Sequence, residues 1–408
     1  MNMFVPEFLL LAIYGVQNAY LPLFLRNVGF SATELGFLYS FFNISGIIVP
    51  LAFTPLIAKR NNFAASLCFF AVMLALIPFA LFTGNFAFTA LFLSLYAAFY
   101  KWLIPVSDSI ITSTLGEAQE KYGMVRVAGS LGFVAMTLVM QRFCRIDGIT
   151  KQGMILWLSV PAFVFGFSVA LRSFILHLAS ARKASTASAS SSANSVSGGQ
   201  KPLPAAGDVP ESTLQILRFL GVDFYLMLFI MFIEFFAMVP SNQFLSLYVK
   251  ESLHINASGV LWALGACAEV PLMFFSGRLI RRFGSEKILL FSTLVVTVRN
   301  LLYTLVPTIG GAVLGQLTHS ITYGLFFPAG IMFCSKMSKL KPKATVIAMT
   351  LFSSVGGLAA VIGAAAGGVI IDNLGYRPLF LVFAAFPVIA VTAYLFVHKF
   401  RKKGFYYK

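Results

Sequence analysis

The sequence predicts an all-α membrane protein with twelve transmembrane helices in two pseudo-symmetric six-helix halves. Three observations predict this fold class. The 408 residues are 59% hydrophobic and 11% charged, with a mean hydropathy of +0.86, whereas a soluble domain carries about 25% charged residues. Apolar runs of about 20 residues, long enough to cross a bilayer, recur between short polar breaks. A Ser- and Ala-rich segment divides these runs into two equal sets.

The apolar runs fix the expected helices and the division of the chain. An N-terminal half, 1–179, and a C-terminal half, 218–398, flank a linker over 180–217, and 399–408 form a basic tail. Residues 180–212 have no apolar period and are rich in Ser, Ala and Gly, which is typical of a flexible linker. The expected helices lie near 4–25, 34–57, 63–83, 87–112, 124–143 and 153–176, then near 220–249, 257–280, 287–306, 310–335, 344–371 and 379–397.

The basic residues indicate the orientation of these helices. Most Lys and Arg residues fall in the breaks on the side of the linker and of both termini, which is the positive-inside bias of cytoplasmic loops. We therefore expect a multi-pass protein of the inner (cytoplasmic) membrane with both termini in the cytoplasm. This bias also accounts for most of the net charge of +16, so we expect no nucleic-acid partner.

The two halves resemble each other in sequence. Residues 21–38 parallel 245–261, and extending this register places Asn18 opposite Asn242. In transporters built from such repeats, the substrate site lies between the halves near the bilayer midplane.

Several ionisable residues lie inside the expected helices, where a charge costs several kcal/mol and usually marks a transport pathway. By the rise of 1.5 Å per residue, Glu269 lies about 18 Å from either end of its helix, and Arg299 and His319 lie at a similar level on the next two helices. A carboxylate, a guanidinium and an imidazole at one level can neutralise one another. The alternatives are a structural ion-pair network, a satisfied core histidine, or a proton-coupling group at Glu269.

Other polar and aromatic residues are candidates for a cavity lining or a gate. Asp108 lies close to the cytoplasmic surface, so a gate or a loop anchor is favoured there. Lys101 faces a cavity or extends its charge to the membrane surface, and the amide and aromatic side chains line a cavity or hold helices together. The expected cavity residues are Tyr14, Gln17, Asn18, Tyr20, Tyr100, Lys101, Trp102, Glu234, Asn242, Gln243 and Tyr323.

These features resemble the major facilitator superfamily. The sequence Gly277-x-x-x-Arg281-Arg282-x-Gly284 is similar to the cytoplasmic loop signature of that superfamily, although an acid is usual where Arg281 stands. Nearly the whole chain resembles the phenylpropionate permease branch, which is related to lactose permease and the nucleoside symporters. This resemblance rests on "IPVSD" ending at Asp108, "YGMVRVAGSLGFV" around Arg126, "GVLWALGACAEV" around Glu269, Arg299 and His319.

The resemblance implies a proton symporter for a small organic solute. It implies roles for Glu269, Arg299 and His319 in a network of proton and substrate contacts, and a gate or cytoplasmic-loop role for Asp108, Arg126, Gly277, Arg281, Arg282 and Gly284. The second acid that lactose permease carries one turn after its histidine is Thr322 here, so Glu269, Asp108 or Glu234 has to replace it.

The expected function is secondary active transport of an aromatic acid, a sugar or a nucleoside-like solute by alternating access, with a proton as the coupled partner. An uncoupled facilitator, a proton-antiport exporter and a non-transporting receptor are the alternatives. We expect no enzyme activity, cofactor or metal, because the four His residues are scattered and the four Cys residues lack metal-ligand spacing. We expect the protein to lie in the lipid bilayer and to function as a monomer.

Overall fold

The computed structural model describes residues 3–60, 63–115, 122–188, 213–338 and 342–402, and within these ranges the regular structure is helical. Among these described residues, ten helices are long and apolar enough to cross a membrane. Each expected helix coincides with a helical segment, which confirms the all-α membrane fold. Since α2 and α6 are not among the ten, the count of twelve spans stays a prediction.

The N-terminal half contains six long helical segments. They are α1 (Phe4–Val28), α2 (Ala32–Arg60), α3 (Phe63–Leu76) continued by α4 (Pro78–Leu81), α5 (Phe86–Leu115), α6 (Tyr122–Phe143) and α7 (Lys151–Ser188), with the short helix η2 (Ile146–Gly148) before α7. α7 extends into the predicted linker, because its last turns are rich in Ala, the strongest helix former. The prediction for 189–212 lies outside the described residues.

The C-terminal half begins at α8 (Thr213–Ala237), which bends at Gly221, where φ is 75°. Two of its spans contain π-helical turns, which are frequent at functional sites. The elements are α9 (Val239–Gln243), α10 (Leu245–Leu247), the π turn η3 (Tyr248–Ser252), α11 (Ser258–Phe283), α12 (Ser285–Leu305), α13 (Ile309–Leu317), the π turn η4 (Ser320–Leu325), α14 (Phe326–Met337), α15 (Pro342–Leu374) and α16 (Tyr376–Lys402). α16 thus includes the start of the predicted tail, and 403–408 are outside the described residues.

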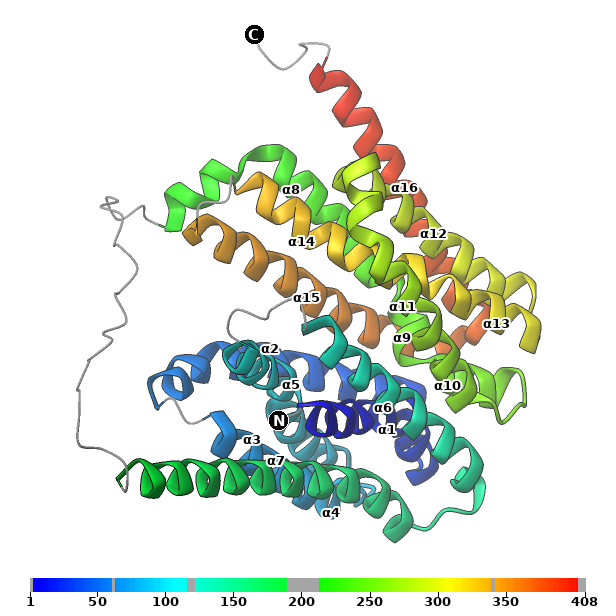
Figure 1. Ribbon diagram of the computed structural model, residues 1–408. Helices are drawn as coiled ribbons and strands as arrows, with labels where there is room; N and C mark the ends of the chain where they lie inside the picture. The colour runs from blue at the N-terminus through cyan, green and yellow to red at the C-terminus, as the bar shows by residue number, and fades with distance from the viewer. Residues whose placement is uncertain (1–2, 61–62, 116–121, 189–212, 339–341, 403–408) are drawn as a thin grey trace.

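The two halves lie side by side, with α1 to α7 below and α8 to α16 above in Figure 1. Their ribbons approach each other on the right of the view and diverge toward the left, where α7 ends and α8 begins. We call this left side the linker end. The opposite side carries Gly29, Arg145, residues 252–257 and Gly375, and we call it the latch end.

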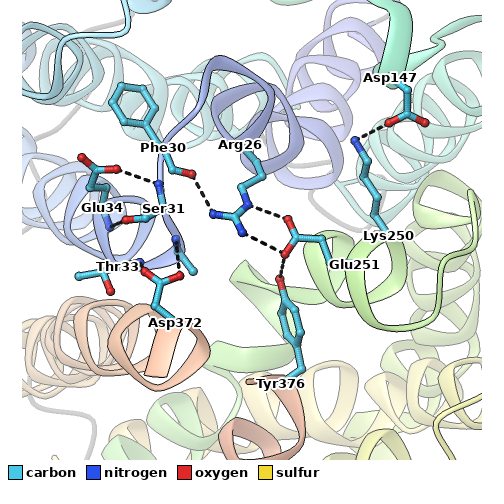
Figure 2. A network of polar contacts seen from close by, with 11 residues as sticks. Arg26, Phe30, Ser31, Thr33, Glu34, Asp147, Lys250, Glu251, Asp372 and Tyr376 are labelled. Carbon is cyan, nitrogen blue, oxygen red and sulfur yellow. Dashed lines mark hydrogen bonds and ion pairs between the residues drawn. The ribbon is translucent and has the colours of Figure 1, made fainter. Parts of the chain in front are cut away.

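Polar contacts join the halves at the latch end (Figure 2). Arg26 Nε lies 2.7 Å from Glu251 Oε1, and Tyr376 donates a hydrogen bond of 2.8 Å to Oε2 of the same carboxylate. The Asp372 carboxylate accepts hydrogen bonds from the backbone N–H groups of Ala32 and Thr33 at 3.1 and 2.6 Å. These N–H groups begin α2 and have no partner within the helix, so Asp372 caps α2 from the other half.

Glycines let the backbones of the two halves approach closely at this end. A Cβ at Gly36 of α2 would meet the carbonyl oxygen of Ala364 of α15, and one at Gly368 would meet the carbonyl oxygen of Ala32. Small residues at such helix crossings are the usual basis of close packing in membranes. The latch end is therefore closed by backbone packing and by ionic contacts together.

Candidate functional site

The structure brings together the three ionisable residues that the sequence places at one level. Arg299 Nη1 lies 3.2 Å from His319 Nδ1, and His319 Nε2 lies 3.6 Å from Glu269 Oε2. A guanidinium only donates, so His319 Nδ1 accepts, and the imidazole is neutral with its hydrogen on Nε2. Arg299 therefore directs the Nε2–H of His319 toward the Glu269 carboxyl group.

Arg299 is held in place by neutral groups. Its side chain is buried on α12 and donates to Thr322 Oγ1 and to Gln316 Oε1, at 3.3 Å each. Thr322, which occupies the position of the expected second acid, is thus a ligand of the guanidinium. Gln316 is a site residue that was not predicted, because an amide side chain in a membrane helix serves equally often to pack helices together.

Glu269 is closely approached by a glycine of η4 and is followed by a proline in its own helix. A Cβ at Gly324 in η4 would lie 2.8 Å from Glu269 Cγ, so only glycine lets η4 approach this side chain without displacing it. Pro271 follows within α11 and removes one backbone hydrogen bond. The Glu269 side chain is 17% exposed and that of His319 is 15%, so neither is fully buried.

A second charge cluster lies in the N-terminal half and was not predicted as such. Glu7 of α1 is fully buried; its carboxylate accepts from Arg126 Nη1 at 2.7 Å and from Ser107 Oγ at 3.0 Å. Arg126 Nη1 also lies 3.6 Å from Asp108 Oδ1. An acid within the first apolar run was one usable signal, but Glu7 lies only a few residues from the start of the helix.

Arg126 connects the two clusters electrostatically. It lies on α6, which packs against α11 of the other half. Its charge acts on the Glu269 carboxyl group and on the Tyr323 hydroxyl, both in the C-terminal half. A chain of ionisable groups therefore crosses the interface, from Glu7 through Arg126 to Glu269, His319 and Arg299.

The predicted aromatic and amide residues of the N-terminal half fall into two groups. Tyr14 stacks on Tyr100 with 4.1 Å between ring centroids, and Tyr100 donates to Asn18 Oδ1 at 3.4 Å. Lys101 lies 5.2 Å from the centre of the Phe42 ring. In the second group, Trp102 packs within the N-terminal half, against Phe70. Tyr20 donates to the backbone oxygen of Thr137 at 3.3 Å, and its hydroxyl also lies against Gly259 of α11 in the other half.

The candidates of the C-terminal half are also separated. Tyr323 stacks on His319, with 5.3 Å between ring centroids, and so belongs to the ionisable chain. Asn242 and Gln243 lie in α9, half-buried. Glu234 is fully buried between α8 and α12 and has no exposed surface in this conformation. The Oε1 atoms of Gln17 and Gln243 are buried and accept no hydrogen bond.

The predicted loop motif lies at the linker end, at the junction of α11 and α12. Gly284 has a φ of 87°, a left-handed conformation that favours glycine, and it separates the two helices. Arg281 and Arg282 are exposed in the last turn of α11, and Gly277 is half-buried one turn before them. Cations in this turn are favoured by the helix dipole.

Comparison with known proteins identifies the family. The sequence model of the MFS_1 like family matches residues 2–382. The chain belongs to the MFS_1 like family. This MFS_1-like protein is 26% identical over 73% of its length to the uncharacterized transporter YwbF of Bacillus subtilis (strain 168), of which 67% is covered. It is 24% identical over 81% of its length to a maltose permease of Geobacillus stearothermophilus, of which 75% is covered.

Solved structures show the same fold. The nucleoside transporter NupG superposes with a TM-score of 0.75 at 15% identity, over 98% of this chain and all of that one. A POT family transporter in complex with a thioalcohol conjugated peptide superposes with a TM-score of 0.65 at 13% identity, over 98% and 95% of the two chains. The MFS_1-like protein is therefore a multi-pass membrane transporter and not an enzyme.

Proposed function

We propose that this MFS_1-like protein is a secondary active transporter that moves a small organic solute together with a proton by alternating access. The observation that carries the proposal is the position of Glu269. It lies partly exposed on the C-terminal half, beside the neutral His319 and under the charge of Arg126 from the other half. A carboxyl group whose neighbours differ between two arrangements of the halves can bind a proton in one and release it in the other.

The two ends of the molecule support alternating access between two rigid halves, 1–179 and 218–398. The latch end is joined by the Arg26–Glu251 pair and by the cap that Asp372 forms on α2. With the basic residues and both termini in the cytoplasm of the inner membrane, this conformation faces the cytoplasm. Transport then requires the latch end to open while the linker end closes, and a monomer contains every part of this cycle.

The side chains between the halves favour a polar solute with a ring. Tyr14, half-buried and stacked on the buried Tyr100, supplies an aromatic surface, and the buried Oε1 atoms of Gln17 and Gln243 are acceptors that a hydroxyl or N–H of the solute can satisfy. A sugar, a nucleoside-like solute or an aromatic acid has such groups. The names of the maltose permease and of the nucleoside transporter agree with the first two classes.

Uptake into proteoliposomes tests this proposal. The purified protein is reconstituted and offered maltose, uridine and 3-phenylpropionate, each with and without an inward proton gradient. We expect accumulation of one of these classes against its gradient only when protons flow inward. Equal uptake without the gradient would indicate the uncoupled facilitator, accumulation only with an outward proton gradient would indicate the antiporter, and binding without flux would indicate a receptor.

A further inference from the structure

Glu234 is a buried carboxyl group that the charge chain of the interface does not use. It lies on α8 with 0% exposure, and its two oxygens contact hydroxyl groups of α12. Ser292 Oγ lies 2.6 Å from Oε1, and Thr293 Oγ1 lies 2.8 Å from Oε2. Each hydroxyl also faces a backbone oxygen: Ser292 that of Ile321 at 3.0 Å, and Thr293 that of Leu289 at 2.8 Å.

The number of hydrogens in this cluster indicates the protonation state. Four oxygen–oxygen contacts are present, and each needs one hydrogen. An ionised Glu234 leaves only the two hydroxyl hydrogens, so two contacts would join oxygens without a hydrogen between them. A neutral carboxyl group supplies a third: it donates to Ser292, and Ser292 then donates to Ile321. The protonated state satisfies more of these contacts than the ionised state.

The charges around Glu234 lead to the same state. Among the described residues of α12, α14, α15, α16 and η4, the groups that act on the carboxyl group are the hydroxyls of Ser292 and Thr293. Arg299 lies later on the same helix, α12, and its guanidinium contacts His319, Thr322 and Gln316. Glu7, by contrast, is equally buried but is paired with Arg126 at 2.7 Å. A buried carboxylate without a cation is strongly disfavoured and becomes neutral instead.

We propose that Glu234 is a second proton-binding site of this transporter, occupied while the latch end is closed and able to exchange its proton when η4 rearranges. This inference rests on the proposed function for the role of that proton in transport. Glu234 would then replace the second acid, whose position is occupied by Thr322. Its proton is enclosed in this conformation because the carboxyl group has no exposed surface.

The cluster is connected to the charge chain by one hydroxyl. Ser292 of α12 bonds to the backbone of Ile321, and the next residue, Thr322, accepts from Arg299. When the O–H bond of Glu234 breaks, its proton passes to water, and Ser292 turns its own O–H to the new carboxylate. The Ile321 carbonyl then loses the hydrogen bond from Ser292 and keeps that from the Phe326 N–H, so the state of Glu234 is linked to the π turn that follows His319.

Infrared spectroscopy of the full-length protein in detergent tests the state of Glu234 without any solute. The carbonyl stretch of a protonated carboxyl group lies above the amide band. We expect the difference between wild type and Glu234→Gln at neutral pH to show this band at the intensity of one carboxylic acid per chain. Glu7→Gln is the matched control, and its difference spectrum should show a carboxylate and no carboxylic acid. A carboxylate difference for Glu234→Gln would overturn the proposal.

Two further measurements keep the test independent of the folding of one variant. Ser292→Ala retains Glu234 and removes a hydrogen bond, so the band should move to higher frequency; an unmoved band would overturn the assignment. In D2O, the band of the wild type should exchange slowly, and Gly368→Ala, which separates α2 from α15, should speed the exchange at least severalfold. Equal exchange rates would contradict an enclosed proton. If solute uptake into proteoliposomes proved independent of the proton gradient, the proposed function would be contradicted, but these spectra would be unchanged.

Discussion

Arg26 of α1 and Glu251 of η3 join the two halves of the molecule, with Nε of the first 2.7 Å from Oε1 of the second. Both side chains are partly exposed, at 32% and 25%, so the pair contributes about 0.2–1 kcal/mol to closure. Two hydrogen bonds complete the network: the Tyr376 hydroxyl donates to Glu251 Oε2, and the carbonyl oxygen of Phe30 accepts from Arg26 Nη1 (Figure 2). The pair is weak enough to break in every cycle.

Removing this pair should shift the latch end toward opening. We expect Arg26→Ala to raise the open population by about two- to fivefold, which corresponds to the energy of one exposed ion pair. Spin labels at Asn85→Cys and Thr308→Cys, both exposed residues of the latch end in opposite halves, report the separation in a background without native cysteines. Arg142→Ala, an arginine whose assigned contact is the neighbouring Phe143 ring, is the control and should leave the distance distribution unchanged.

A methyl group at the crossing of α2 and α15 should have a larger effect. Gly368→Ala places a Cβ against the carbonyl oxygen of Ala32, and such overpacking costs about 1–3 kcal/mol. We expect the ratio of closed to open molecules at the latch end to fall about 5- to 160-fold, measured with the same labels. Gly148→Ala is the matched control, because a Cβ there meets nothing within 4 Å. A closed population equal to that of the wild type would show that the halves do not close by this packing.

The contact between η4 and Glu269 should be sensitive to one added carbon. Gly324→Ala would place its Cβ 2.8 Å from Glu269 Cγ and displace the carboxyl group from His319. We expect proton-driven accumulation in proteoliposomes to fall at least tenfold. Gly310→Ala, where the nearest atom lies at an ordinary 3.7 Å, should accumulate solute normally. Normal accumulation by the Gly324 variant would show that proton-driven transport does not depend on the position of the Glu269 carboxyl group.

The Glu7–Arg126 pair should stabilise the N-terminal half. Arg126→Met removes the cation from the fully buried Glu7 and leaves the hydrogen bond from Ser107. Arg126 is itself 33% exposed, so the loss should cost less than the roughly 3–5 kcal/mol of a fully buried pair. We expect a clear decrease in the unfolding temperature, measured by the fluorescence of a thiol-reactive dye. The double variant Glu7→Met and Arg126→Met should recover most of it. Equal destabilisation by the single and double variants would show that the pair is not coupled.

Much of the fold could be predicted because bilayer-spanning helices need long apolar runs and little else. The common depth of Glu269, Arg299 and His319 in the membrane was predicted from the helix rise alone. In the structure, His319 contacts both Arg299 and Glu269. Glu7 was missed because its depth depends on how α1 packs against α6, which no local pattern encodes. Gln316 was missed because the π turn that begins at Ser320 sets which side chains face Arg299.

The enclosure of Glu234 is a further feature that sequence could not supply. Its position within a span was evident, but whether it faces a cavity or a neighbouring helix depends on the rotation of α8. The hydroxyls of Ser292 and Thr293 that surround it are short polar side chains of α12, and these are common in membrane helices without any role. The pairing of Arg26 with Glu251 likewise joins residues far apart in the chain, so only the assembled halves reveal it.

Solute uptake by Glu269→Gln tests the central claim most directly. The variant keeps the size of the side chain and fixes it in the neutral form. In proteoliposomes with an inward proton gradient, we predict that the variant accumulates solute against its gradient at least tenfold less than wild-type protein reconstituted in the same amount. Accumulation by Glu269→Gln at the wild-type level would contradict the role of Glu269 in proton coupling.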